Sequence, residues 1–174
     1  NEDYAVALYG PCNSDNIGTR NFISQFINTS VSSGMDHPYG LAVNPATGDI
    51  YVSNQHDDTV LRFYGPESPN AGQALPPPPS ISNPQYPGLF MQLNTSSQGV
   101  RSVAFNCDIT SPSLFVAQED DNLVYVVDPT SGNTVSSISV SVPISLYTDC
   151  GSSTLFIGSH DDNNPQVVAV DVNT

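Results

Sequence analysis

The chain has 174 residues, of which 3 are Arg or Lys and 17 are Asp or Glu, so its formal charge at pH 7 is -14. A field of this sign repels phosphate and argues against a nucleic-acid-binding protein. No apolar run approaches the roughly 20 residues of a membrane-spanning helix. The hydrophobic residues, 38% of the chain, lie in short and regularly spaced groups. We therefore expect a folded, acidic, β-rich domain with no membrane span and no nucleic-acid partner.

The first part of the chain, residues 1–30, contains two apolar runs. Residues 3–11 align with residues 58–66, and both stretches end in Tyr-Gly-Pro. The alignment predicts that residues 3–11 hold the third strand of a repeated unit and that residues 21–27 form its fourth strand. On this interpretation the chain starts inside a repeat.

Residues 37–97 contain the first full copy of the repeat. A β-rich run at 39–43 comes first, and two short apolar runs separated by an Asp-rich turn follow within residues 49–63. Residues 88–93 supply a fourth run after a Pro-rich insertion at 65–88. β-branched and aromatic residues bounded by Gly, Pro, Asn and Asp predict β-strands in all four runs.

The same design returns in residues 98–141 and 142–174. Phe115 and Phe156 occupy equivalent positions 41 residues apart, whereas Tyr51 precedes Phe115 by 64 residues because of the Pro-rich insertion. The last predicted strand, residues 166–171, is again a third strand. The chain is therefore expected to end, as it starts, inside a repeat.

Four short strands in about 40 residues, repeated along the chain, predict the four-stranded antiparallel blades of a β-propeller. A helical fold is excluded because no apolar set recurs at i, i+3, i+4 and i+7 over a useful length. Propellers avoid exposed sheet edges by closing a ring. About three blade periods with incomplete blades at both ends do not close. We expect a partial ring that lies within a longer chain or is completed by neighbouring copies, as in a filament.

Three segments of the first full copy resemble an NHL repeat: residues 37–45 (HPYGLAVNP), 48–54 (GDIYVSN) and 60–63 (VLRF). Residues 125–135 resemble the related YVTN propellers, which include those of surface-layer proteins. The resemblance implies a propeller fold over nearly the whole chain. It does not define an activity, because propellers host lactonases, lyases, adhesins and protein-binding platforms.

Asn44, Asn106 and Asp149 occupy equivalent positions at the end of the first strand of each copy. First strands line the channel of a propeller, and related six-bladed lactone hydrolases hold a divalent cation there with Asn, Asp and Glu. The resemblance therefore makes these three residues candidate metal ligands. The alternative is that each closes the turn to the second strand, because Asn and Asp bond readily to the local backbone.

The turns between the second and third strands are acidic and would suit Ca²⁺, which prefers hard oxygen ligands. Their spacing matches no EF-hand, and solvated turns explain them equally. The three turns are His56-Asp57-Asp58, Glu119-Asp120-Asp121 and His160-Asp161-Asp162. His37 precedes a first strand and is the candidate general base if the channel is catalytic.

The cysteines allow one disulfide between adjacent blades. Cys107 and Cys150 follow Asn106 and Asp149 directly, so they occupy equivalent positions in neighbouring copies. Neighbouring first strands lie close together, and a disulfide forms if the Cα atoms approach within about 7 Å. Buried free thiols are the alternative, and Cys12 is expected to be free or paired outside this segment.

Two sequons, Asn28-Thr29-Ser30 and Asn94-Thr95-Ser96, are acceptors for N-linked glycans in a secreted protein. The chain also lacks Lys and is rich in Ser, Thr and Asn. These features predict an extracellular or cell-surface location.

Pro76, Pro77, Pro78 and Pro79 lie in the middle of the insertion and predict a polyproline II segment, since prolines donate no backbone hydrogen bond. The segment is either a surface excursion between two strands or an interaction arm. In the second case O-linked glycans are an added possibility, by resemblance to algal and plant cell-surface glycoproteins.

Two classes of function follow. The favoured one is a non-enzymatic extracellular propeller that acts as a structural or adhesive module, with other copies of the chain and glycans as partners. It would be a subunit of a glycosylated surface filament or appendage. The alternative is a metal-dependent hydrolase or lyase of the six-bladed type. An intracellular protein-binding propeller is disfavoured by the sequons and the lack of Lys.

Overall fold

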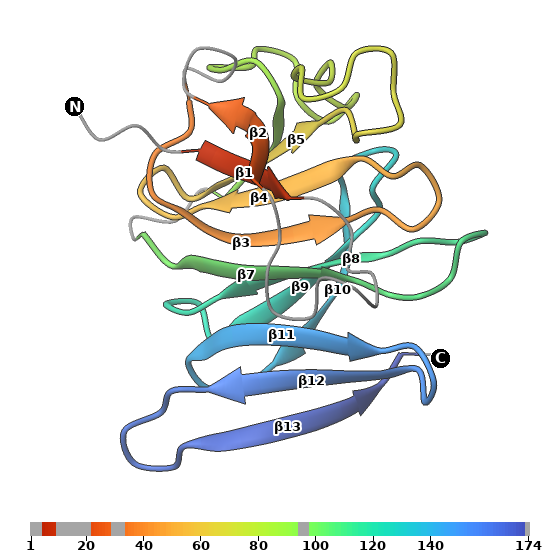
Figure 1. The fold of residues 1–174 in the computed structure, drawn as a ribbon. Helices are drawn as coiled ribbons and strands as arrows, with labels where there is room; N and C mark the ends of the chain where they lie inside the picture. The colour runs from red at the N-terminus through yellow and green to blue at the C-terminus, as the bar shows by residue number, and fades with distance from the viewer. Residues whose placement is uncertain (1–4, 10–21, 29–33, 94–97, 173–174) are drawn as a thin grey trace.

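The computed structural model describes residues 5–9, 22–28, 34–93 and 98–172. Within these ranges the chain forms thirteen β-strands, and all neighbouring strands run antiparallel. The same ranges contain no helix of a length and apolarity that would let it cross a membrane. The fold is all-β, as predicted (Figure 1).

The strands form four sheets, each drawn from one continuous stretch of chain. The N-terminal hairpin consists of β1 (Ala5–Tyr9) and β2 (Phe22–Asn28). The first blade has the order β3 (Pro38–Val43), β4 (Ile50–Asn54), β5 (Thr59–Phe63) and β6 (Leu89–Gln92). The second blade has the order β7 (Val100–Phe105), β8 (Leu114–Gln118), β9 (Leu123–Val127) and β10 (Thr134–Ser139). The third blade consists of β11 (Pro143–Asp149), β12 (Thr154–Ser159) and β13 (Gln166–Asp171).

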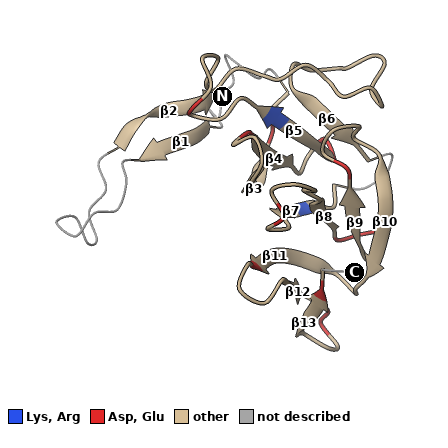
Figure 2. Ribbon diagram, turned by 90° about the vertical axis from the view of Figure 1, so that its right-hand side faces the viewer, with Lys and Arg blue, Asp and Glu red and all other residues tan. Residues whose placement is uncertain are grey.

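The three blades pack side by side in the order of the chain. In Figure 2 the first strands β3, β7 and β11 lie along one side, and the outer strands β6 and β10 lie along the opposite side. Strand β7 also contacts both β3 and β11. Each first strand has a register irregularity near its start, between Pro38 and Leu41, Val100 and Val103, and Pro143 and Ser145. Such bulges increase the local twist, which suits sheets that pack in a fan.

The core is divided into three apolar clusters, one between each pair of successive sheets. Tyr51 of β4 faces the second blade, where its ring meets Phe105 edge-on with centroids 5.0 Å apart. Its neighbours Ile50 and Val52 face the N-terminal hairpin instead. Successive side chains of a strand point to opposite faces, so one strand supplies two clusters. A third cluster joins the second and third blades through side chains such as Leu155.

This layering explains the sequence of the central strands. All five residues of β4 (IYVSN) and of β8 (LFVAQ) are buried, because a sheet covers each of their faces. Strand β10 is mostly exposed and correspondingly polar. The apolar runs that identify the blades in the sequence are thus the strands covered on both sides.

Candidate functional sites

The three residues predicted to converge on a metal each bond within their own turn. Asn44 follows β3, and its Oδ1 accepts a hydrogen bond from the backbone N–H of Ala46 at 2.9 Å. Asn106 follows β7, and its Oδ1 accepts from the N–H of Ser113 at 2.8 Å. Asp149 ends β11, and its carboxylate accepts from the Ser152 hydroxyl at 2.6 Å.

These bonds account for the residue types without a metal. The Ser152 hydroxyl and backbone N–H groups hold the pKa of Asp149 below its usual range. Among the described residues, no group of three or more His, Cys, Asp or Glu side chains is arranged to hold a metal ion. Turn formation therefore explains all three positions, and the metal-binding interpretation stays a prediction.

A disulfide joins Cys107 to Cys150, as their equivalent positions predicted. The two Cα atoms are 5.4 Å apart. The cysteines lie just after β7 and β11, so the bond connects the first-strand turns of the second and third blades. Cys12 lies outside the described residues.

One residue of the acidic turns, Asp58, is not solvated, because it is only 3% exposed. Its carboxylate accepts hydrogen bonds from the N–H of Val100 at 2.9 Å and from Nε2 of Gln118 at 2.9 and 3.0 Å. Both donors belong to the second blade, whereas Asp58 belongs to the first. Burial is the largest influence on this carboxyl and raises its pKa to about 6.

The next pair of blades repeats this connection with a neutral side chain. Oδ1 of Asn122 accepts a hydrogen bond from the N–H of Val142 at 2.8 Å. Asp58 and Asn122 both have positive φ, 55° and 58°, a conformation in which Asn and Asp are enriched. We call this contact between successive blades the inter-blade latch.

Three other acidic side chains of these turns also have partners. Glu119 pairs with Arg101, Asp121 accepts a hydrogen bond from the Tyr125 hydroxyl at 2.7 Å, and Asp161 accepts from the Ser141 hydroxyl at 2.8 Å. Burial and the adjacent Asp121 raise the pKa of Tyr125 to about 12. The expectation of Ca²⁺ at these turns stays a prediction.

Two histidines that are distant in the sequence stack on each other. The rings of His37 and His56 have centroids 4.6 Å apart and planes inclined by 17°. Nδ1 of His56 lies 3.2 Å from a carboxylate oxygen of Asp36, and Nδ1 of His37 lies 2.6 Å from the carboxamide group of Gln55. Residues 37 and 56 flank the paired ends of β3 and β4, where Pro38 is opposite Asn54. The hairpin register would have predicted this pair, which the sequence analysis missed.

The Pro-rich insertion folds back onto the second blade. Nη2 of Arg62 donates to the carbonyl of Pro76 at 2.6 Å, and Nη1 donates to the carbonyl of Pro129 in the second blade at 3.3 Å. Pro78 is buried, and the N–H of Ser80 donates to the carbonyl of Ser131 at 3.3 Å. We call residues 75–81 the strap, because they connect the first blade to the β9–β10 turn.

The strap thus has an intramolecular role that the interaction-arm hypothesis did not foresee. The Gly132 backbone fits it closely, since a Cβ there would lie 2.7 Å from Cγ of Pro78. Pro76, Pro77 and Pro79 remain exposed. A partner contact at these three prolines, and O-linked glycans on the tract, stay predictions.

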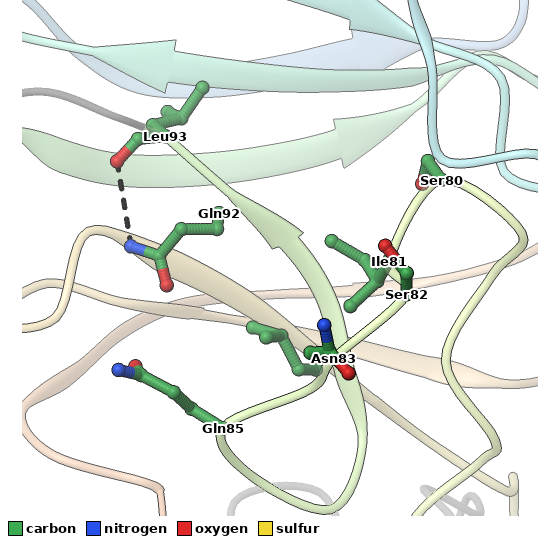
Figure 3. A pocket seen from close by; sticks show the side chains of 8 residues that line it. Ser80, Ile81, Ser82, Asn83, Gln85, Gln92 and Leu93 are labelled. Carbon is green, nitrogen blue, oxygen red and sulfur yellow. Dashed lines mark hydrogen bonds between the residues drawn. The ribbon is translucent and has the colours of Figure 1, made fainter.

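A cavity of about 670 Å³ lies beside the strap (Figure 3). Residues 80–83 and Gln85 of the insertion form one part of its lining, and Leu89, Gln92 and Leu93 form the other. The described residues of the lining include no charged side chain, although the chain as a whole is strongly acidic. This site could not be identified in the sequence, because its two parts meet only through the fold of the insertion.

The third blade exposes an apolar face. Phe156 of β12 is paired with Tyr147 on one side and Ala169 on the other. In the second blade the equivalent row is Ala104, Phe115 and Val126. Phe115 is 3% exposed because the third blade covers it, whereas Phe156 is 36% exposed and Tyr147 is 65% exposed.

The two sequons fall at the margins of the described regions. Asn28 is the last residue of β2. Asn94 lies outside the described residues. Glycosylation at both positions stays a prediction.

No protein-family model and no curated protein matches the sequence. Solved structures with a propeller fold do match. A chain of the nidogen/laminin complex is 10% identical, with a TM-score of 0.58 over 88% of this chain and 49% of its own length. Regucalcin from Agrobacterium tumefaciens, described as a calcium-binding protein, is 15% identical, with a TM-score of 0.51 over 84% of this chain and 44% of its own length. At these identities the likeness shows the fold alone, and the chain spans about half the length of either structure.

Proposed function

We propose that this chain is part of a non-enzymatic, extracellular β-propeller that serves as a structural or adhesive module. Further blades cover the exposed face of its third blade, and they come from a longer polypeptide or from neighbouring copies in a surface filament. The proposal rests on one observation. The aromatic residues Tyr51, Phe115 and Phe156 are equivalent, and the first two are 2% and 3% exposed while the third is 36% exposed.

The exposed face has the composition of an internal contact. Phe156, Tyr147 and Val167 lie on one side of the third blade, and Val167 is 71% exposed. Burial of apolar surface contributes about 25 cal/mol per Å², so an adjoining sheet on this face would be strongly stabilising. Contiguous exposed apolar surface of this kind marks interaction sites in folded proteins.

Two features support an extracellular location. The Cys107–Cys150 disulfide suits an oxidising compartment, and disulfides of this kind are rare in the cytosol. The sequons at Asn28 and Asn94 would carry N-linked glycans during secretion. The nidogen/laminin complex is an assembly of propeller-containing protein with a protein partner, which agrees with a module that functions by protein contact.

Thiol accessibility in the intact protein tests the proposal. The Phe156→Cys variant is expected to resist maleimide labelling in the assembled protein and to react after urea unfolding. The Ile109→Cys variant is a matched control, because Ile109 is 65% exposed in the turn between β7 and β8. Equal labelling rates of the two thiols in the native assembly would refute a covered third blade.

A second candidate, the metal-dependent hydrolase or lyase, is supported only by the resemblance of regucalcin, which is described as calcium-binding. Calorimetric titration with Ca²⁺ tests it. Binding that disappears in Asp149→Asn would support a cation at the turns after the first strands. Binding unaffected by that substitution, or absent, would count against this candidate.

A further inference from the structure

The cavity beside the strap has a chemistry that differs from the rest of the chain. Ser80, Ser82, Asn83, Gln85 and Gln92 supply hydroxyl and carboxamide groups to its lining. The apolar part of the lining consists of Ile81, Leu89 and Leu93. Hydroxyls and carboxamides both donate and accept hydrogen bonds without carrying charge. A neutral ligand that is itself both donor and acceptor matches this lining.

Three of these side chains are available to a ligand. Ser82, Asn83 and Gln85 are exposed, and their side chains make no hydrogen bond with the residues that the structure describes. Gln92 is held in place, because its Nε2 donates to the carbonyl of Asp57 at 2.9 Å. Figure 3 shows Asn83 and Gln85 on the insertion and Gln92 on β6.

The insertion holds these groups in a fixed frame. Arg62 fastens the strap at Pro76, Pro78 is buried against the β9–β10 turn, and Ile81 packs on the cluster between the first blade and the N-terminal hairpin. Prolines at 84 and 87 further restrict the backbone on either side of Gln85. Lining residues that are ordered before binding lose less conformational entropy when a ligand binds.

We propose that this cavity binds a neutral oligosaccharide. Sugar hydroxyls pair with the carboxamides of Asn83 and Gln85, and the C–H face of a sugar ring packs on Ile81, which is half-buried. The volume of about 670 Å³ lies within the range of small-molecule sites, about 300 to 1,000 Å³. An anionic ligand is disfavoured, because the lining residues that the structure describes supply no cation and the chain carries a charge of -14.

Side-chain amide signals in NMR spectra test this inference directly. Triacetylchitotriose, cellotriose and mannotriose are the neutral probes, trigalacturonate is the anionic probe, and an uncharged β-strand peptide is the competing class. We expect at least one neutral trisaccharide to shift the amide signals of Asn83, Gln85 and Gln92 with a Kd of about 1 mM or tighter.

Matched substitutions separate this site from general surface binding. Asn83→Ala and Gln85→Ala are each expected to weaken binding by roughly tenfold, since each removes a paired carboxamide. Asn163→Ala, in the exposed β12–β13 turn, is the control and should leave the Kd unchanged. The inference is wrong if no neutral probe shifts these signals, if trigalacturonate or the peptide binds as tightly, or if the control weakens binding equally. It does not depend on the proposed function, because the cavity lies within one chain.

Discussion

The inter-blade latch at Asp58 makes the stability of the chain depend on pH in an unusual direction. Asp58→Asn keeps the size of the side chain and one acceptor oxygen but removes the charge. Asn122 already makes the equivalent contact between the second and third blades, so a carboxamide oxygen can accept the backbone bond that Val100 donates to Asp58. The substitution therefore tests the charge rather than the shape of the latch.

The magnitude follows from the pKa of Asp58. Burial raises it from 3.8 to about 6, and each pKa unit corresponds to about 1.4 kcal/mol. Because the folded protein holds this proton more tightly than the unfolded chain, the free energy of unfolding rises as the pH falls through this window. The gain from this group is complete below the ordinary pKa and amounts to about 3 kcal/mol. Asp121 on the β8–β9 turn contributes to the shift, since its negative charge disfavours a second one nearby.

Urea unfolding of both proteins at a series of pH values between neutrality and about 3 provides the assay. The other carboxyls titrate in both proteins, so they cancel in the difference between the two unfolding free energies. We expect the wild type to gain about 3 kcal/mol relative to Asp58→Asn as the pH falls across the window. A difference that stays constant over this range would refute the argument that the latch contains a buried charge.

Three further results are expected. Replacing Cys107 and Cys150 by Ser should lower the free energy of unfolding by about 4 kcal/mol in urea titrations, because the disulfide closes a loop with a sequence separation of 43 residues. An unchanged midpoint of urea unfolding would contradict this expectation. Arg62→Met should destabilise the chain by about 2 kcal/mol and speed hydrogen exchange in the strap, since the carbonyls of Pro76 and Pro129 lose a charged donor. Unaltered hydrogen exchange would show that the strap is held by other contacts. Endoglycosidase treatment of the secreted protein should lower its mass in two steps, one lost in Asn28→Gln and the other in Asn94→Gln; a mass that does not change would exclude N-linked glycans.

The sequence was informative wherever structure depends on neighbours along the chain. Strand positions follow from short apolar runs, and the fully buried β4 and β8 carry the most continuous runs. The Cys107–Cys150 disulfide was predictable because equivalent positions of adjacent repeats lie side by side in a propeller. Asn44 bonds to the N–H two residues on, so its turn interpretation needs only local geometry.

The features that the sequence did not predict depend on contacts between distant segments. Asp58 lies in an acidic stretch that is typical of a solvated turn, yet its partner Gln118 lies 60 positions away in another blade. The strap is docked by Arg62 and by the β9–β10 turn, neither of which is marked by the run of prolines. The cavity arises from that docking, so it could not be inferred from the composition of the insertion.

The most direct test of the proposed assembly is an electron cryo-microscopy structure of the protein in its native assembly. We expect a further sheet packed on Phe156 and Tyr147, with the outer edge of β13 paired to an antiparallel strand. A map in which this face and this edge contact only solvent would contradict the proposal that other blades complete the ring.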